Sequence, residues 1–169
     1  MRQIRYQVAA SLDGFIAGPN GEIDWILHDP TVNFAEVFGG FDIAMMGRKT
    51  FEFAQTGPGA KIPGMRTIVC SGTLKAEEYP EFLVTADAVA TAKEVKTEIG
   101  KDIWLFGGGE LFRTLLDAGL IDRVEVAVMP VLLSKGIPFL PAGKRAPQMT
   151  LMKSQAKPNG VVTLVYNCR

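Results

Sequence analysis

The apolar positions of this chain fall into short runs, and most of these runs end in glycine, serine or proline. Residues 2–10 alternate polar and apolar side chains at first and then become continuously apolar, which is typical of a strand that enters the centre of a sheet. Runs of the same kind predict further strands at 41–47, 66–70, 82–84, 102–106 and 121–129.

Apolar residues at helical spacing predict helices between several of these strands. One helix follows the glycines at 107–109 and ends near Gly119. Another spans 87–98, with Asp87 as its candidate N-cap and Gly100 at its end. Shorter helices are expected at 30–40 and 48–53. The apolar faces of the two longer helices are formed by Leu111, Phe112, Leu115 and Leu116, and by Ala88, Ala92, Val95 and Ile99.

Two stretches rich in glycine and proline, 11–21 and 131–143, are expected to be loops, the second with room for a short strand. Near the end of the chain, 149–157 and 161–168 flank Pro158-Asn159-Gly160, a strong hairpin signal. The chain therefore alternates strands and helices and finishes on antiparallel strands, which predicts the α/β class. All 169 residues are expected to form one domain.

The overall charge is balanced, with 18 basic and 18 acidic residues and no basic run, so we expect no nucleic-acid or anionic-membrane partner. The N-terminal segment is too polar for a signal peptide, and no apolar run approaches the length of a membrane span. Cys70 and Cys168 make neither a disulfide framework nor a metal-ligand spacing. These features predict a soluble, cytoplasmic protein without a metal site.

Three consecutive glycines, Gly107 to Gly109, join an apolar strand to a helix. Glycines let a ligand approach the backbone, and a helix start offers unpaired N–H groups and the positive end of the helix dipole. This arrangement suits an anion, in particular a phosphate, although a tight turn without a ligand explains the glycines equally well. The dinucleotide fingerprint of the doubly wound fold would need a further glycine at Phe112, so the sequence indicates a different nucleotide fold.

Two other predicted strands end in the same way, one at Gly47 before Arg48-Lys49-Thr50 and one at Cys70 before Ser71. Because the carboxyl ends of parallel strands line one edge of a sheet, we expect the three turns to face one crevice and to bind a ligand with several phosphates. Arg48 and Lys49 in a first helical turn oppose the helix dipole unless an anion offsets them. The alternative is that both are solvated surface cations.

Taken in order, the segments 46–52, 68–71 and 107–112 resemble the dihydrofolate reductase family. The opening segment 9–17 is similar to that family's riboflavin-biosynthesis reductase branch and its small bacterial relatives, and the resemblance covers nearly the whole chain. It implies a three-layer fold, with a mixed, mostly parallel sheet of about eight strands, flanking helices and a C-terminal antiparallel hairpin. It also implies NADPH as cofactor and hydride transfer to a flat heterocycle.

By the same resemblance, particular residues would contact the cofactor. Arg48, Lys49 and Ser71 would hold the adenosine 2′-phosphate, and an arginine can grip a phosphate through two parallel N–H bonds. Ala9 and Ile16 would meet the nicotinamide carboxamide. The pyrophosphate would lie on Thr50 and the backbone of Gly108, Gly109, Glu110 and Leu111, with Gly47 and Gly107 also lining the cofactor.

One position departs from the family pattern. Dihydrofolate reductases place a buried carboxylate on the first helix, a few residues after a tryptophan that matches Trp25, whereas this chain has Pro30-Thr31 there. Neither Asp29 nor Glu36 is in register with that carboxylate. A pterin needs the carboxylate for binding and protonation, so classical dihydrofolate reduction is not expected.

On the substrate side, Asp13 is the best candidate for a catalytic acid, and the alternative is an Asp-Gly turn in which it caps its own backbone. Asp24 could orient a substrate amide or cap the next turn, and Trp25 could stack on a substrate ring or belong to the core. Ser11 and Glu36 complete the candidate substrate residues, and Glu36 could instead be solvated on its helix.

The sequence therefore predicts an NADPH-dependent reductase of a small pterin- or pyrimidine-like substrate, in which water or Asp13 delivers the proton. One alternative is reduction of a ribosylaminopyrimidine phosphate in riboflavin synthesis, for which the substrate side offers few basic residues beyond Lys135, Lys144 and Arg145. Another is a non-catalytic NADPH-binding module. By resemblance we also expect a homodimer, in which the closing strands or 124–128 meet across a two-fold axis.

Overall fold

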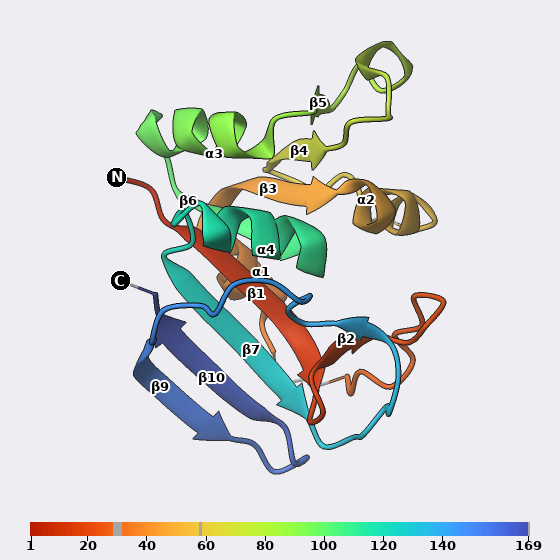
Figure 1. Ribbon diagram of the computed structural model, residues 1–169, viewed down its shortest axis with the longest axis vertical. Coiled ribbons are helices and arrows are strands. Elements are labelled where there is room, and N and C mark those ends of the chain that lie inside the picture. Colours follow the sequence, from red (N-terminus) through yellow and green to blue (C-terminus); the bar gives the residue numbers. More distant parts are fainter. Residues whose placement is uncertain (29–31, 58, 169) are drawn as a thin grey trace.

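A mixed sheet of eight strands runs through the centre of the protein (Figure 1). The computed structural model describes residues 1–28, 32–57 and 59–168. In the part of the chain it describes, the strand order is β5-β4-β3-β6-β1-β7-β10-β9, and the first six strands are parallel. β10 pairs antiparallel with both β7 and β9, which forms the predicted C-terminal hairpin. The strands are β1 Ile4–Ser11, β3 Phe41–Gly47, β4 Arg66–Cys70, β5 Leu83–Thr85, β6 Asp102–Gly107, β7 Arg123–Met129, β9 Thr150–Ala156 and β10 Val162–Asn167.

Helices cover both faces of the sheet, which makes the three-layer α/β fold that the sequence predicts. On one face, α3 (Ala88–Thr97) and α4 (Gly109–Asp117) pack over a core that contains Leu105 and Phe112. On the other face, α2 (Arg48–Gln55) packs over Trp104 and its neighbours. Residues 103–105 are all buried because β6 has helices on both sides, and this explains its continuous apolar run.

The helix α1 (Phe34–Gly39) lies behind the sheet in Figure 1. It begins after Asn33, whose side chain accepts the N–H of Ala35 at 3.1 Å. At its other end, the ring of Phe38 packs on Trp104 with 4.9 Å between ring centroids. The predicted helix start at residue 30, and with it Asp29 and Thr31, lies outside the described residues.

The end of α3 differs from the prediction. The helix stops at Thr97, the next residue is extended (φ −65°, ψ 155°), and Ile99 is fully exposed instead of packing on the core. At this point the Glu98 carboxylate forms ion pairs with Arg2 and Arg66. These ion pairs hold the Glu98 side chain toward the sheet. Gly100 does not cap the helix; a Cβ atom there would lie 3.0 Å from the Arg2 guanidinium carbon.

The predicted loop at 11–21 contains a strand that local pattern does not reveal. Within it, β2 (Phe15–Ala17) pairs antiparallel with β8 (Ile137–Pro138), the short strand for which 131–143 left room. These two strands form a separate small sheet. The residues of β2 are too few for a periodic signal, and a partner about 120 residues away supplies their hydrogen bonds. Among the described residues, no helix is long and apolar enough to cross a membrane.

Candidate functional site

Three strand-to-helix or strand-to-loop turns meet at the carboxyl edge of the sheet. β3 lies between β4 and β6, with Gly47 in register with Cys70 and Met46 in register with Gly107. A Cβ atom on Gly47 would lie 3.9 Å from both the Gly107 carbonyl oxygen and the Gly108 nitrogen. The turn after β3 therefore touches the turn after β6, and the turn after β4 is the next one along the same edge.

Thr50, in the first turn of α2, faces the glycine turn after β6. A Cβ atom on Gly108 would lie 3.3 Å from the Thr50 hydroxyl oxygen, and one on Gly107 would lie 3.6 Å from it. Gly107 has a φ of +149°, which favours glycine, and its peptide bond to Gly108 is cis. A side chain on Gly108 would crowd the Thr50 hydroxyl, whereas one on Gly107 would meet it at ordinary van der Waals distance and would be disfavoured by the backbone conformation instead.

Two of the helices that start at this edge, α2 and α4, have no side-chain caps. Gly47 precedes α2 and Gly108 precedes α4, and neither can offer a side-chain acceptor to the first N–H groups of its helix. By contrast, α1 and α3 are capped by the side chains of Asn33 and Asp87, and α3 also starts at this edge, since the Thr85 carbonyl at the end of β5 accepts the Ser71 N–H at 2.8 Å. Unpaired N–H groups and the positive ends of two dipoles thus come together, an arrangement that suits a ligand with more than one phosphate.

Two cations lie beside these helix starts. Arg48 and Lys49 are exposed in the first turn of α2, which carries no acidic residue there. An Nη atom of Arg48 lies 3.2 Å from a carboxylate oxygen of Glu52, a solvent-exposed pair of the kind that contributes little to stability. Ser71, on the loop after β4, accepts the N–H groups of Thr73 and Leu74.

The remaining cofactor candidates differ in what they expose. Glu110 is exposed in the first turn of α4, whereas Gly109 and the side chain of Leu111 are buried, so Leu111 could meet a ligand only through its backbone. Ala9 is partly buried in β1, in register with Ala127 of β7. Ile16 is partly buried in β2.

The side chains of Asp13 and Ser11 form hydrogen bonds with each other and with nearby backbone N–H groups. The Ser11 hydroxyl donates to an Asp13 carboxylate oxygen at 2.7 Å and accepts the Phe15 N–H at 2.9 Å. The Asp13 carboxylate also accepts the N–H groups of Leu133 and Ser134. The Ser11 hydroxyl and these backbone donors lower the pKa of Asp13 from its usual value, so at neutral pH this side chain is a carboxylate that accepts hydrogen bonds.

The other substrate candidates make no hydrogen bond or ion pair to these turns among the described residues. Asp24 is exposed on the segment that follows β2. Trp25 is partly buried, and its indole N–H donates to the Glu22 carbonyl at 3.0 Å. Glu36 is exposed in the first turn of α1. No hydrogen bond or ion pair joins these three side chains to the glycine turns within the described ranges.

Local sequence pattern does not show that the segment after β7 packs against the glycine turn. A Cβ atom on Gly109, the first residue of α4, would lie 2.6 Å from the Pro138 carbonyl oxygen and 3.0 Å from Pro141 Cδ. The segment 131–141 therefore packs directly against the glycine turn. No periodicity marks such a contact, because it depends on close approach of two backbones that are distant in sequence.

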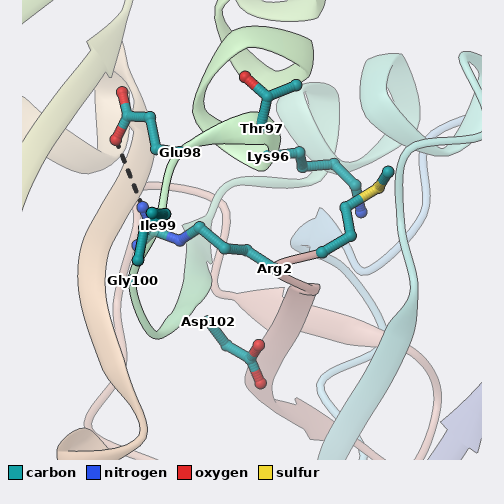
Figure 2. A pocket seen from close by; sticks show the side chains of 8 residues that line it. Arg2, Lys96, Thr97, Glu98, Ile99, Gly100 and Asp102 are labelled. Atoms are coloured by element: carbon teal, nitrogen blue, oxygen red, sulfur yellow. Dashed lines mark hydrogen bonds and ion pairs between the residues drawn. The ribbon is translucent and has the colours of Figure 1, made fainter.

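A cavity of about 580 Å³ opens at the opposite, amino edge of the sheet (Figure 2). Its charged lining is largely paired within the protein: the buried Arg2 guanidinium forms ion pairs with Asp42 and Glu98, and Lys96 forms one with Asp122. We therefore interpret the charged residues around this cavity as a network of ion pairs that stabilises the fold. The described residues contain no group of three or more His, Cys, Asp or Glu side chains that could hold a metal.

The fold is that of an α/β protein of the dihydrofolate reductase-like type, with two helix starts that lack side-chain caps at the carboxyl ends of its parallel strands. Residues 2–163 match the RibD C-terminal domain, and the chain belongs to that family. This agrees with the resemblance noted from the sequence.

Curated relatives occur in Bacillus subtilis (strain 168). The uncharacterized protein YyaP is 30% identical over 178 residues, which cover 98% of this chain and 95% of that protein. The uncharacterized protein YwjB is 30% identical over 138 residues, which cover 78% of this chain and 79% of that protein.

Solved structures share the fold at low sequence identity. A putative riboflavin biosynthesis protein from Shewanella sp. PV-4 is 22% identical with a TM-score of 0.78, over 99% of this chain and 98% of that one. A diaminohydroxyphosphoribosylaminopyrimidine deaminase/5-amino-6-(5-phosphoribosylamino)uracil reductase from Thermotoga maritima is 17% identical with a TM-score of 0.72, over 98% of this chain and 56% of that one. These structures show the fold that this chain shares with other members of the RibD C-terminal domain type.

Proposed function

We propose that this protein is a reductase that binds NADPH along the carboxyl edge of β4, β3 and β6 and reduces a small pyrimidine- or pterin-like heterocycle. The observation that carries the proposal is the packing of Gly47 against the Gly107–Gly108 peptide. This packing brings two helix starts without side-chain caps to one point, where a pyrophosphate would find N–H donors. When bound, NADPH supplies the hydride, and the protein binds and orients both reactants.

The side chains at this edge fit such a cofactor. The N–H groups at the starts of α2 and α4 and the Thr50 hydroxyl would hold the pyrophosphate. Arg48, Lys49 and the loop at Ser71 would hold the 2′-phosphate, because both cations are exposed beside the turn after β4. Ala9 and Ile16 would meet the nicotinamide end.

The substrate class is proposed from the family. Membership in the RibD C-terminal domain family favours a pyrimidine over a pterin, and the second candidate is accordingly a ribosylaminopyrimidine phosphate. Lys135 would be a cation for its phosphate, since it is exposed two residues before β8, the strand that pairs with β2. Asp24, Trp25 and Glu36 are the side chains we propose to test for substrate contact.

The experiment that tests the proposal is a fluorescence titration with NADPH, NADH and 2′,5′-ADP, followed by assays of cofactor oxidation with pterins, aminopyrimidines and quinones. We expect NADPH to bind more tightly than NADH and 2′,5′-ADP to compete with it. Binding without oxidation by any of these acceptors would favour a non-catalytic NADPH-binding module. Absence of binding to all three nucleotides would contradict the proposal.

We also propose that the protein forms a homodimer through the β7–β10–β9 end of the sheet. All seven residues of the edge strand β9 are exposed, including Leu151 (51%) and Met152 (59%). Val126 and Leu164, in register on neighbouring strands, are only partly buried. Sedimentation velocity should give a dimer, and Met152→Asp should shift it toward monomer, since a charge in an apolar interface is costly. A wild-type monomer at micromolar concentration would contradict this proposal.

A further inference from the structure

The Asp13 carboxylate ties the turn after β1 to the segment after β7. One of its oxygens accepts the Ser11 hydroxyl at 2.7 Å and the Leu133 N–H at 3.1 Å. The other oxygen accepts the Ser134 N–H at 2.7 Å. We call this set of contacts, Ser11-Asp13 with Leu133-Ser134, the Asp13 clasp. Its two sides are about 120 residues apart in sequence, so the clasp holds together segments that local structure cannot.

The clasp also holds an unusual backbone conformation. Ser134 has a φ of +65°, in the left-handed region that side chains other than glycine rarely adopt. Its N–H points to the Asp13 carboxylate in this conformation. Backbone bonds from Leu12 to Val131 (2.9 Å) and from Phe139 to Gly14 (2.8 Å) lie on either side of the clasp. The clasp is thus the centre of a continuous set of bonds between the two segments.

From the clasp, contacts lead to the glycine turn. β2 and β8 pair just beyond it, with Phe15 in register with Pro138, and Gly136 packs against the Ala17 carbonyl. The Pro138 carbonyl in turn lies against Gly109, the first residue of α4. Ile16, between the two paired residues of β2, is therefore held at a set position relative to the start of α4.

We propose that Asp13 is a positioning residue, which as a hydrogen-bond acceptor fixes the 11–17 segment against the start of α4 and so preforms the seat of the nicotinamide half of the cofactor. This inference rests on the proposed function. It gives Asp13 a role different from that of a proton donor, because both of its oxygens already accept hydrogen bonds.

The test compares Asp13→Asn with Asp117→Asn, a control of the same charge change at an exposed carboxylate paired with Arg113 at the far end of α4. In Asp13→Asn an amide NH₂ replaces one oxygen, so at least one donor of the clasp loses its acceptor. Hydrogen exchange of the peptide 131–138, measured by mass spectrometry, should accelerate in Asp13→Asn and not in the control. The dissociation constant for NADPH should rise about tenfold, which corresponds to one lost hydrogen bond to a charged group.

The second nucleotide separates positioning from a general loss of structure. 2′,5′-ADP lacks the nicotinamide, so its affinity for Asp13→Asn should stay within about twofold of wild type. Equal losses for NADPH and 2′,5′-ADP, or unchanged exchange of 131–138, would overturn the positioning role while leaving NADPH binding by the wild type intact. Failure of the wild type to bind either nucleotide would overturn the proposed function itself, and with it this role of Asp13.

Discussion

The buried ammonium group of Lys96 on α3 pairs with the carboxylate of Asp122, and the same carboxylate oxygen accepts the Ile4 N–H at 2.8 Å. The two side chains are only 6% and 14% exposed. Asp122 therefore connects α3 to the first strand of the sheet, at the edge opposite the candidate site. A charge pair this well buried is costly to break on one side only, because the remaining charge stays in a poorly solvated place.

Replacing Lys96 by methionine should lower the free energy of unfolding by about 3 kcal/mol. Urea denaturation followed by circular dichroism measures the loss. Arg66→Met is the matched control: its partner Glu98 lies 2.8 Å away, but both side chains are well exposed, so the loss should be below about 1 kcal/mol. Equal losses in the two variants would show that burial of the Lys96–Asp122 pair does not increase its contribution to the free energy of unfolding.

Gly107→Ala should destabilise the protein by about 2 kcal/mol, since its φ of +149° strains a residue with a Cβ atom. Gly47→Ala is the control from the same edge. Gly47 has a φ of −78°, and the nearest atoms to a Cβ there would be 3.9 Å away, so its unfolding free energy should change by less than about 0.5 kcal/mol. Thermal or urea denaturation decides between them, and a Gly47→Ala loss as large as that of Gly107→Ala would contradict the geometry of this turn.

Arg48→Ala should weaken NADPH binding about tenfold or more and leave NADH binding within about twofold, because only NADPH carries the 2′-phosphate. Glu52→Gln should act in the opposite direction, since the Glu52 carboxylate lies 3.2 Å from Arg48 and competes for it. Fluorescence titrations at fixed ionic strength measure both. Arg66→Ala, at the amino end of β4, is the control; equal losses for NADPH and NADH would remove Arg48 from the proposed role.

The Asp13 clasp should depend on pH in a defined direction. Hydrogen bonds from Ser11 and the backbone lower the pKa of Asp13 in the folded protein, so the clasp stabilises the fold above the unfolded-state pKa, and this contribution is lost as the pH falls through the folded-state pKa. The amide chemical shift of Ser134 should therefore stay constant from pH 8 to 5 and change only below about 3.9, the ordinary aspartate value. A midpoint above that value would mean that the carboxylate is not held as described.

Tyr6→Phe should leave the protein as stable as wild type or stabilise it by about 1 kcal/mol. The Tyr6 hydroxyl is fully buried and has no hydrogen-bond partner among the described residues, while its ring stacks on Phe112 with 3.9 Å between centroids. Phenylalanine keeps the stacked ring and removes a hydroxyl whose burial is uncompensated. Urea denaturation tests this, and a clear loss of stability would contradict the absence of a partner.

Helices and strands could be predicted from the sequence where their burial produces a clear pattern of apolar residues. The strand at 41–47 and the helix after it are correct because a strand covered on both faces needs a continuous apolar run, and a glycine at its end starts the next helix. The convergence of Gly47 and Gly107 also followed, since parallel neighbouring strands must end at one edge. Roles of single site residues, such as Arg48 or Ile16, are still predictions.

Other features depend on contacts that no local pattern encodes. The β2–β8 pair, the exposure of Ile99 and the packing of Pro138 on Gly109 each come from segments that meet only in the folded chain. The same is true of Asp13, which reads as a turn residue or an acid in sequence and becomes the acceptor of two N–H groups about 120 residues away.

The amino-acid sequence by itself thus determined the α/β class, the glycine-ended strands and the meeting of their turns at one edge, because hydrophobic period and glycine position act locally. Only the tertiary structure decided which loops close over that edge and what Asp13 holds. Hydrogen bonds between distant segments form only after the sheet has brought those segments together.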